Sequence, residues 1–382
     1  MQNILFYISG HGYGHATRAI EVINALAAKN PNLYFHIKSN APHWIFELNV
    51  KASHSFYPLK TDIGVAQQTS FEIDKLQTLA QWQALYREKP VLVEKEAAFA
   101  LRNDIKIVIG DIPPLAFDVA EQAGVPSVAI GNFSWDWILS EYIREIPVFA
   151  DVVAHIQESY RKADLLLRLP MHGDLSVFQN IKDIPLIARR AVEPKSKILK
   201  ALNIETTPQS ILVLVALRAT DLAEVDLETA FSDRRYLFIT LGFERTFENS
   251  LNVAPDFIRF PELVNACDLV VSKPGYGLVS EIVANRTPLL YTSRADFIEY
   301  NVLVKWVRKY TVWRFISREH FTAGCWGTHL DLLQKDETAW EHVDLDGAER
   351  AAENIGAIFG FKMDSQHGEA ARENNSNQDK TM

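Results

Sequence analysis

The chain has 382 residues, which is more than one ordinary hydrophobic core requires and suits two domains. It is 48% hydrophobic and 23% charged, a composition that excludes a disordered or fibrous protein. Its formal net charge of -9, without a dense cluster of lysine and arginine, gives no electrostatic reason to expect nucleic acid as a partner.

Two cysteines, Cys267 and Cys325, argue against a framework of disulfides in so long a chain and fit a reducing compartment. The N-terminal apolar run is too short for a signal peptide, and no run approaches the roughly 18 apolar residues that span a bilayer. We therefore expect a cytoplasmic protein without a transmembrane segment, and peripheral contact with a membrane surface stays open.

The first half alternates predicted strands with predicted helices. The apolar residues 4–8 predict a buried parallel strand over 3–9, and Ile20, Ile23 and Leu26 form one face of a helix over 17–28. Helices are also expected at 71–101, broken at Pro90, and at 115–123. Further strands are expected at residues 34–39, 54–59, 105–110, 127–130 and 163–169. This alternation indicates parallel βαβ units with right-handed crossovers.

The alternation pauses between about 171 and 208, which places a domain boundary near 189–194, and then resumes. Strands are expected at 211–217, 236–241, 256–260, 269–272 and 288–292, and helices at 278–284 and 345–361. We predict an α/β protein with two Rossmann-like domains whose parallel sheets face an interdomain cleft. The expected units are an N-terminal domain at 1–188, a C-terminal domain at 189–345, a helix at 346–361 that packs back on the domains, and a disordered tail at 362–382.

A glycine-rich turn joins the first strand to the first helix, in Ser9-Gly-His-Gly-Tyr-Gly-His-Ala-Thr-Arg18. Such a turn lets an anion approach the free N–H groups of a helix N-terminus. It is not a dinucleotide fingerprint, because its third glycine comes too early and Ser39-Asn40 after the second strand offers no acid for a ribose. It is not a P-loop either, because no glycine is followed by lysine and then serine or threonine. A plain strand-to-helix turn stays open, although His11 and His15 have a poor packing rationale in it.

Asp111 ends the fourth predicted strand, at the same edge of the sheet as this first loop. A carboxylate there would accept the Nδ1 proton of His15 and orient the imidazole as a general base. The alternative is that Asp111 caps the next helix or turn.

A second strand, glycine turn and helix follow in the other half, at Ser272-Lys-Pro-Gly-Tyr-Gly277. Gly275 and Gly277 would let a diphosphate approach the helix N-terminus, and Glu281 one turn later would hold a ribose. The alternative for Glu281 is an acid favoured by the helix dipole, worth about 0.3–1 kcal/mol.

The aromatic residues Phe133, Trp135 and Trp137 follow the fifth predicted strand at alternate positions. They would stack on a sugar, or they would fill the core between loops. The pair Asp344 and Asp346 resembles a metal-binding DxD by its letters alone, and we expect it to begin the last helix and assign no metal to the chain.

Together these residues resemble glycosyltransferases of the GT-B fold, the family of plant nucleotide-sugar transferases and the bacterial peptidoglycan N-acetylglucosaminyl transferase. They resemble still more closely the amino-terminal half of plant L-arabinokinases, which is itself glycosyltransferase-like. That resemblance covers most of residues 1 to about 310, and no glycine-rich kinase loop follows, so kinase activity is not expected. Its motifs are Gly10-His-Gly-Tyr-Gly-His-Ala-Thr-Arg18, Asn132-Phe-Ser-Trp-Asp136, Arg168-Leu-Pro170, Asp183-Ile-Pro-Leu186 with Arg189-Arg190, and Lys273-Pro-Gly-Tyr-Gly277.

The resemblance implies His15 as the catalytic base and Asp111 as its relay. With the residues read above, it gives an expected donor side at Arg218, Lys273, Gly275, Tyr276, Gly277, Ser280, Glu281, Asp296 and Asn301. The expected acceptor side comprises Gly10, His11, Gly12, Gly14, Arg18, Phe133, Trp135 and Asp136. The chain departs from the family in the loop at 216–221, where many members have glycines beside the donor diphosphate. Arg218 in that loop would grip phosphate oxygens, or it is a surface side chain.

We therefore expect a metal-independent glycosyltransferase without a cofactor. Its partners would be a nucleotide-diphosphate sugar, with UDP as the expected nucleotide, and an acceptor hydroxyl. Two alternatives stay open, a nucleotide-sugar-binding or regulatory protein without turnover and a nucleotide-sugar epimerase on the same fold.

Overall fold

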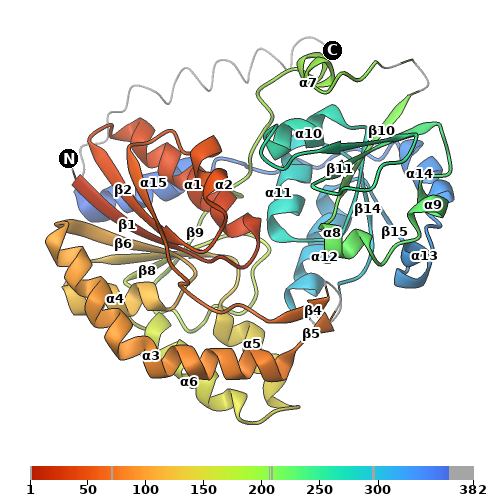
Figure 1. Cartoon of the computed structure of the whole chain (residues 1–382). Helices are drawn as coiled ribbons and strands as arrows, with labels where there is room; N and C mark the ends of the chain where they lie inside the picture. Colours follow the sequence, from red (N-terminus) through yellow and green to blue (C-terminus); the bar gives the residue numbers. More distant parts are fainter. Residues whose placement is uncertain (1, 70–71, 206, 208–209, 295–296, 361–382) are drawn as a thin grey trace.

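The computed structural model describes residues 2–69, 72–205, 207, 210–294 and 297–360, so the expected tail at 362–382 lies outside the described residues. Figure 1 shows two α/β units side by side, each built on a parallel sheet with helices on its faces. The segment from 184 to 210, with helix α7 (Lys195–Ala201), connects the two sheets.

The first sheet has the strand order β3-β2-β1-β6-β7-β8-β9, and every pair in it is parallel. Its strands are β1 (Gln2–Ile8), β2 (Leu33–Ser39), β3 (His54–Pro58), β6 (Ile105–Asp111), β7 (Ser127–Gly131), β8 (Leu165–Arg168) and β9 (Ile181–Asp183). The helices of this unit are α1 (Tyr13–Lys29), α2 (His43–Asn49), α3 (Lys75–Arg102), α4 (Leu115–Ala123), α5 (Trp135–Ile143) and α6 (Phe149–Tyr160). A small antiparallel pair, β4 (Gln67–Thr69) and β5 (Glu72–Ile73), lies apart from the sheet.

The second sheet has the order β12-β11-β10-β13-β14-β15, again all parallel. Its strands are β10 (Ile211–Ala216), β11 (Tyr236–Leu241), β12 (Ser250–Val253), β13 (Leu269–Ser272), β14 (Leu289–Tyr291) and β15 (Trp313–Phe315). Its helices are α8 (Ala219–Leu222), α9 (Leu227–Ala230), α10 (Phe260–Ala266), α11 (Tyr276–Asn285), α12 (Glu299–Tyr310), α13 (Arg318–Thr322) and α14 (Gly327–Gln334).

Two expectations from the sequence are wrong. No strand forms at 256–260; the partner of β11 is β12, an edge strand whose polar Ser250 and Asn252 weaken its apolar signal, and residue 260 begins α10. Helix α3 does not break at Pro90 but continues to Arg102. It buries apolar side chains on both sides of the proline, and this packing offsets the one backbone hydrogen bond that proline cannot donate.

The last described helix, α15 (Gly347–Phe359), belongs in space to the first unit although it follows the second in sequence. It packs against α1, and Asp346 at its start pairs with Ile187 in an isolated bridge. In the described residues, no helix combines the length and the apolar character needed to cross a bilayer.

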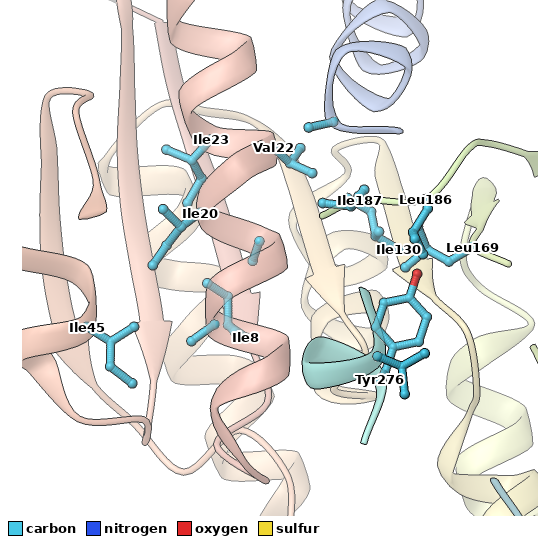
Figure 2. Close-up of a cluster of buried hydrophobic side chains, with 14 of the residues drawn as sticks. Ile8, Ile20, Val22, Ile23, Ile45, Ile130, Leu169, Leu186, Ile187 and Tyr276 are labelled. Carbon is cyan, nitrogen blue, oxygen red and sulfur yellow. The ribbon is translucent and has the colours of Figure 1, made fainter. Parts of the chain in front are cut away.

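One hydrophobic cluster runs through both units. It includes Ile8 and Ile130 of the first sheet and Val279 and Ile282 of α11 in the second unit. Figure 2 shows the ring of Tyr276, the first residue of α11, beside Ile130, Leu169, Leu186 and Ile187. Burial of apolar surface between the units therefore holds α11 against the first sheet.

The two glycine loops meet where α1 and α11 begin. A Cβ atom added to Gly277 would lie 3.0 Å from Cα of Gly14, and one added to Gly14 would lie 3.4 Å from the backbone nitrogen of Gly277. A side chain at Gly277 would make this contact tighter than most real Cβ contacts, so glycine favours the approach that brings the N-terminal ends of both helices together.

We expect Gly277→Ala to separate the loops and to lower the free energy of unfolding by about 1–3 kcal/mol, the cost of overpacking against backbone. Gly275→Ala is the matched control, because nothing lies within 4 Å of its added Cβ and its φ of -138° suits any residue. Urea denaturation of both variants measures the difference. Equal stability of the two would contradict a tight contact between the loops.

Candidate active site

The first loop ends in a helix whose N-terminus is open. Gly12 precedes α1 with φ of 85°, a left-handed value that favours glycine. No side chain caps this end and the first turn carries no acid, so its N–H groups are available to a ligand. His15 lies in the first turn of α1, not in the loop before it.

Asp111, at the end of β6, lies fully buried between His15 and Arg18. Its Oδ1 is 2.8 Å from Nδ1 of His15. Arg18 donates from Nε to Oδ2 at 2.6 Å and from Nη2 to Oδ1 at 2.6 Å, which makes a two-pronged ion pair. Burial raises the pKa of the Asp111 carboxyl, but Arg18 and then His15 outweigh it and hold that pKa below its usual value. Asp111 is thus a buried anion.

The tautomer of His15 determines whether its Nε2 can accept a proton. If Nδ1 carries the proton, it donates to Asp111 and leaves the lone pair of Nε2 free to accept a proton. Nη2 of Arg18 also lies 3.0 Å from the same Nδ1, a geometry in which Nδ1 would accept instead. The carboxylate is the stronger acceptor at the shorter distance, which favours the first arrangement.

A chain of hydrogen bonds links this group to the second unit. Arg18 Nη1 donates to Oδ1 of Asn132 at 2.7 Å, and Nδ2 of Asn132 donates to Oε1 of Glu299 at 2.8 Å. Glu299 is the first residue of α12 and is buried. The orientation of Arg18, and through it of Asp111, thus depends on a carboxylate from the other unit.

The second loop presents another open helix N-terminus. Gly275 precedes α11, whose first turn carries no acid and whose first residue is Tyr276. The ring of Tyr276 lies under the guanidinium of Arg18, 5.0 Å from its centroid. Lys273 pairs with Asp221 at 2.9 Å; burial, opposed by Asp221, lowers the pKa of Lys273 to about 8.

The two loops line a pocket of about 600 Å³, which we call the cationic pocket. Arg218 enters it from the loop after β10 and donates to Oε1 of Gln67 in the first unit at 2.9 Å. Its lining includes Gly10, His11, Gly12, Gly14, His15, Arg18, Phe133, Arg218, Asp221, Lys273, Gly275, Tyr276, Gly277, Arg294, Phe297 and Glu299.

A second pocket of about 580 Å³, which we call the apolar pocket, shares Gly14, Arg218 and Gly277 with the first. Its walls include Trp44, Ile45, Leu48, Leu241, Pro255, Ile258 and Phe260. Glu281 lines it with one oxygen engaged, because Nε of Arg189 donates to Oε1 at 2.6 Å. Oε2 of Glu281 is buried and accepts no hydrogen bond from the described residues. Burial, opposed by Arg189, raises the pKa of Glu281.

Several expected residues lie elsewhere. Trp135 is completely buried and donates its indole N–H to Asp62 at 2.7 Å, so it offers no stacking face. Asp136 lines a different pocket between α5 and α6. Ser280 bonds back to the carbonyl of Tyr276, and Asn301 is exposed on α12.

Asp296 lies outside the described residues. The described part of the chain contains no group of three or more histidine, cysteine, aspartate or glutamate residues placed to hold a metal ion.

Sequence reasoning assigned no role to several residues of this site. Asn132 lies in a quoted motif but received no role, and Glu299 and Arg294 come from a segment without a recognisable pattern. Asp62 accepts from Ser9 and Trp135 beneath the first loop and supports it. Only the polar character of Asn132 after a strand end was a usable signal.

Comparison with known proteins relates the chain to glycosyltransferases. A family model described as glycosyl transferase family 1 matches residues 2–324. The L-arabinokinase of Arabidopsis thaliana is 26% identical over 358 residues, which cover 91% of this chain and 33% of the relative, so the chain spans about a third of its length.

Solved structures show the same fold. UGT2 of Phytolacca americana, complexed with UDP-2fluoro-glucose and pterostilbene, has a TM-score of 0.57 at 11% identity over 94% of each chain. The glycosyltransferase VinC in complex with DTDP has a TM-score of 0.58 at 15% identity over 94% of this chain and 95% of that one. The two parallel-sheet units are thus those of a GT-B glycosyltransferase.

We expect Arg18→Met to lower the free energy of unfolding at neutral pH by about 3–5 kcal/mol, because it leaves Asp111 buried without its cation. Arg168→Met is the matched control: its partner Asp183 is exposed, and such surface pairs contribute about 0–1 kcal/mol. Because the pKa of Asp111 is lowered in the folded chain, its contribution is present above the unfolded value of about 4 and is lost as pH falls.

Urea denaturation across the acid range should therefore show the gap between wild type and Arg18→Met narrow below about pH 4. Equal losses for the two arginine variants, or a gap that widens in acid, would contradict this view of the ion pair.

Proposed function

The chain belongs to glycosyl transferase family 1, and we propose that it transfers a sugar from a nucleoside-diphosphate sugar to a hydroxyl group of an acceptor. The observation that carries the proposal is the buried contact of His15 with Asp111 beside a pocket into which a second helix N-terminus also opens. A base and an anion site at one pocket are the two parts that such a transfer needs.

In the proposed reaction, Nε2 of His15 takes the proton of the acceptor hydroxyl as its oxygen attacks the sugar carbon. Asp111 holds the Nδ1 proton and stabilises the imidazolium that forms. The bond between that carbon and the diphosphate oxygen breaks, and the nucleoside diphosphate leaves with the bonding electrons. A base positioned in this way contributes about 10²–10⁴ in rate.

The leaving diphosphate would lie at the N-terminus of α11. Gly275 has open space where a side chain would be, so phosphate oxygens can reach the N–H groups there. Arg218 and Lys273 add positive charge at the same pocket, and a guanidinium can grip two phosphate oxygens. Because these groups belong to the chain, the proposed mechanism uses no metal ion.

The apolar pocket would hold the nucleoside. Ile258 and Phe260 offer apolar surface for a base, and the unpartnered Oε2 of Glu281 would accept from one ribose hydroxyl. The sequence suggested that Glu281 holds the ribose; Arg189 occupies its other oxygen in the structure. UDP is our first choice of nucleotide, since one structural neighbour was solved with UDP-2fluoro-glucose, and DTDP, seen with another, is the second.

A cytoplasmic location is part of the proposal. Both cysteines are free thiols, Cys267 buried and Cys325 exposed, as expected in a reducing compartment.

A binding or regulatory protein without turnover is the second candidate, and one contact favours it. If Nδ1 of His15 accepts from Arg18 at 3.0 Å, its Nε2 carries the proton and cannot act as a base. The pairing of Lys273 with Asp221 would likewise leave less charge for a leaving diphosphate.

We predict that wild-type protein releases nucleoside diphosphate from UDP-sugars only when an acceptor is present. His15→Gln should lower kcat by about 10²–10⁴ while the Kd for UDP stays unchanged, because His15 acts on the acceptor proton. His172→Gln is the matched control, since His172 is exposed and outside both pockets. Binding of nucleotide sugars with no release under any acceptor would favour the second candidate, and unchanged turnover in His15→Gln would refute the role of His15.

A further inference from the structure

The cationic pocket contains one arginine, Arg294, to which the proposed reaction assigns no part. Its lining carries Arg18, Arg218, Lys273 and Arg294. Arg18 is paired with Asp111, and Lys273 is paired with Asp221. The guanidinium of Arg218 donates to an amide oxygen, that of Gln67, and forms no ion pair with a described residue. Among the residues that the structure describes, Arg294 forms no ion pair.

Arg294 lies on the side of the pocket formed by the first unit. Its guanidinium lies over the ring of Phe297, 4.1 Å from the centroid. Phe297 belongs to the hydrophobic cluster of the first unit, where its ring is 6.3 Å from that of Phe133 and 6.4 Å from that of His11. The guanidinium is thus held against the expected acceptor side, and its N–H groups remain available because the ring takes only one face.

Among the described residues, Glu299 of the same pocket does not form an ion pair with Arg294. Glu299 attracts Arg294 electrostatically, but it lies beyond ion-pair distance and accepts from Asn132 instead. Burial, opposed by Glu299 and reinforced by Arg218, lowers the pKa of Arg294.

His11 lies beside Arg294 in the same pocket. Burial, together with Arg294, His15 and Arg218, lowers the pKa of His11 to about 3. Its ring, 5.3 Å from that of Trp135 and stacked near Phe297, is therefore neutral at physiological pH. A neutral imidazole can donate to or accept from a ligand hydroxyl without adding charge.

We propose that the acceptor carries an anionic group, a phosphate or a carboxylate, that Arg294 binds on the first-unit side of the cationic pocket. This inference rests on the proposed function, which assigns Arg218, Lys273 and the N-terminus of α11 to the donor diphosphate. Arg294 then remains as a cation without an assigned anion. A planar guanidinium binds two oxygens of one phosphate or carboxylate, which would fix the acceptor while His15 takes its proton.

The test titrates anions into protein whose donor side is already filled with UDP. Inorganic phosphate at constant ionic strength is the first probe, followed by glucose 6-phosphate, glucuronate and uncharged glucose, with binding followed by calorimetry. We expect phosphate to bind and at least one charged sugar to bind about tenfold or more tightly than glucose, the scale of a hydrogen bond to a charged group. Which charged sugar binds tells phosphate from carboxylate.

Arg294→Gln should abolish the preference for the charged probes and leave UDP binding unchanged. Arg308→Gln is the matched control, because Arg308 also lies over an aromatic ring in the second unit but outside the pocket. No binding of phosphate or of a charged sugar to UDP-bound wild type overturns the proposal. The proposal is also overturned if Arg294→Gln loses affinity for UDP but still prefers the charged probes. That result would assign Arg294 to the donor.

The same titrations without nucleotide separate this inference from the proposed function. If UDP does not bind at all, yet phosphate binds and Arg294→Gln removes that binding while Lys273→Gln does not, the donor assignment fails and the anion site at Arg294 stands. If UDP binds and turnover occurs but no probe distinguishes Arg294→Gln from Arg308→Gln, the proposed function stands and this inference fails.

Discussion

Asp111 brings a carboxylate to the fully buried end of β6, where a charge is costly unless a cation and hydrogen bonds compensate it. Arg18 supplies both, and its Nη1 donates to Asn132, which in turn donates to Glu299 of the second unit. Nδ1 of His15 contacts the same carboxylate. The need to compensate one buried charge therefore sets the position of His15 and ties it to the second unit.

Apolar packing and two glycines hold that arrangement in place. The cluster shared by the two units fixes α11 against the first sheet, and the contact of Gly14 with Gly277 brings two helix N-termini together. The cationic pocket and the apolar pocket both extend from this contact. A donor that spans them would have its nucleoside among apolar side chains and its diphosphate at α11, with its sugar within reach of His15. Exclusion of water there would protect the donor from hydrolysis.

Local patterns in the sequence were enough for much of the fold. Apolar runs located β1, β6 and β10. Their alternation with helices predicted parallel sheets, because strands that are apolar throughout are typical of parallel sheets covered by helices on both faces. The closeness of His15 to Asp111 followed from strand ends meeting at one sheet edge. The pairing of Arg18 with Asp111 did not, because Arg18 lies off the apolar face of the predicted helix and shows no pattern typical of a buried residue. Glu299 and Arg294 enter the site only through docking of the units, and burial of Trp135 depends on Asp62 beneath it.

The central claim is that His15 keeps its proton on Nδ1, against Asp111, and presents an unprotonated Nε2 to the pocket. Nitrogen NMR of ¹⁵N-histidine-labelled protein at neutral pH tests it directly, with His15→Gln identifying the signal. The account predicts that Nδ1 of His15 carries the proton and that Nε2 shows the shift of an imidazole nitrogen without one. A proton on Nε2, with Nδ1 accepting from Arg18, would contradict it.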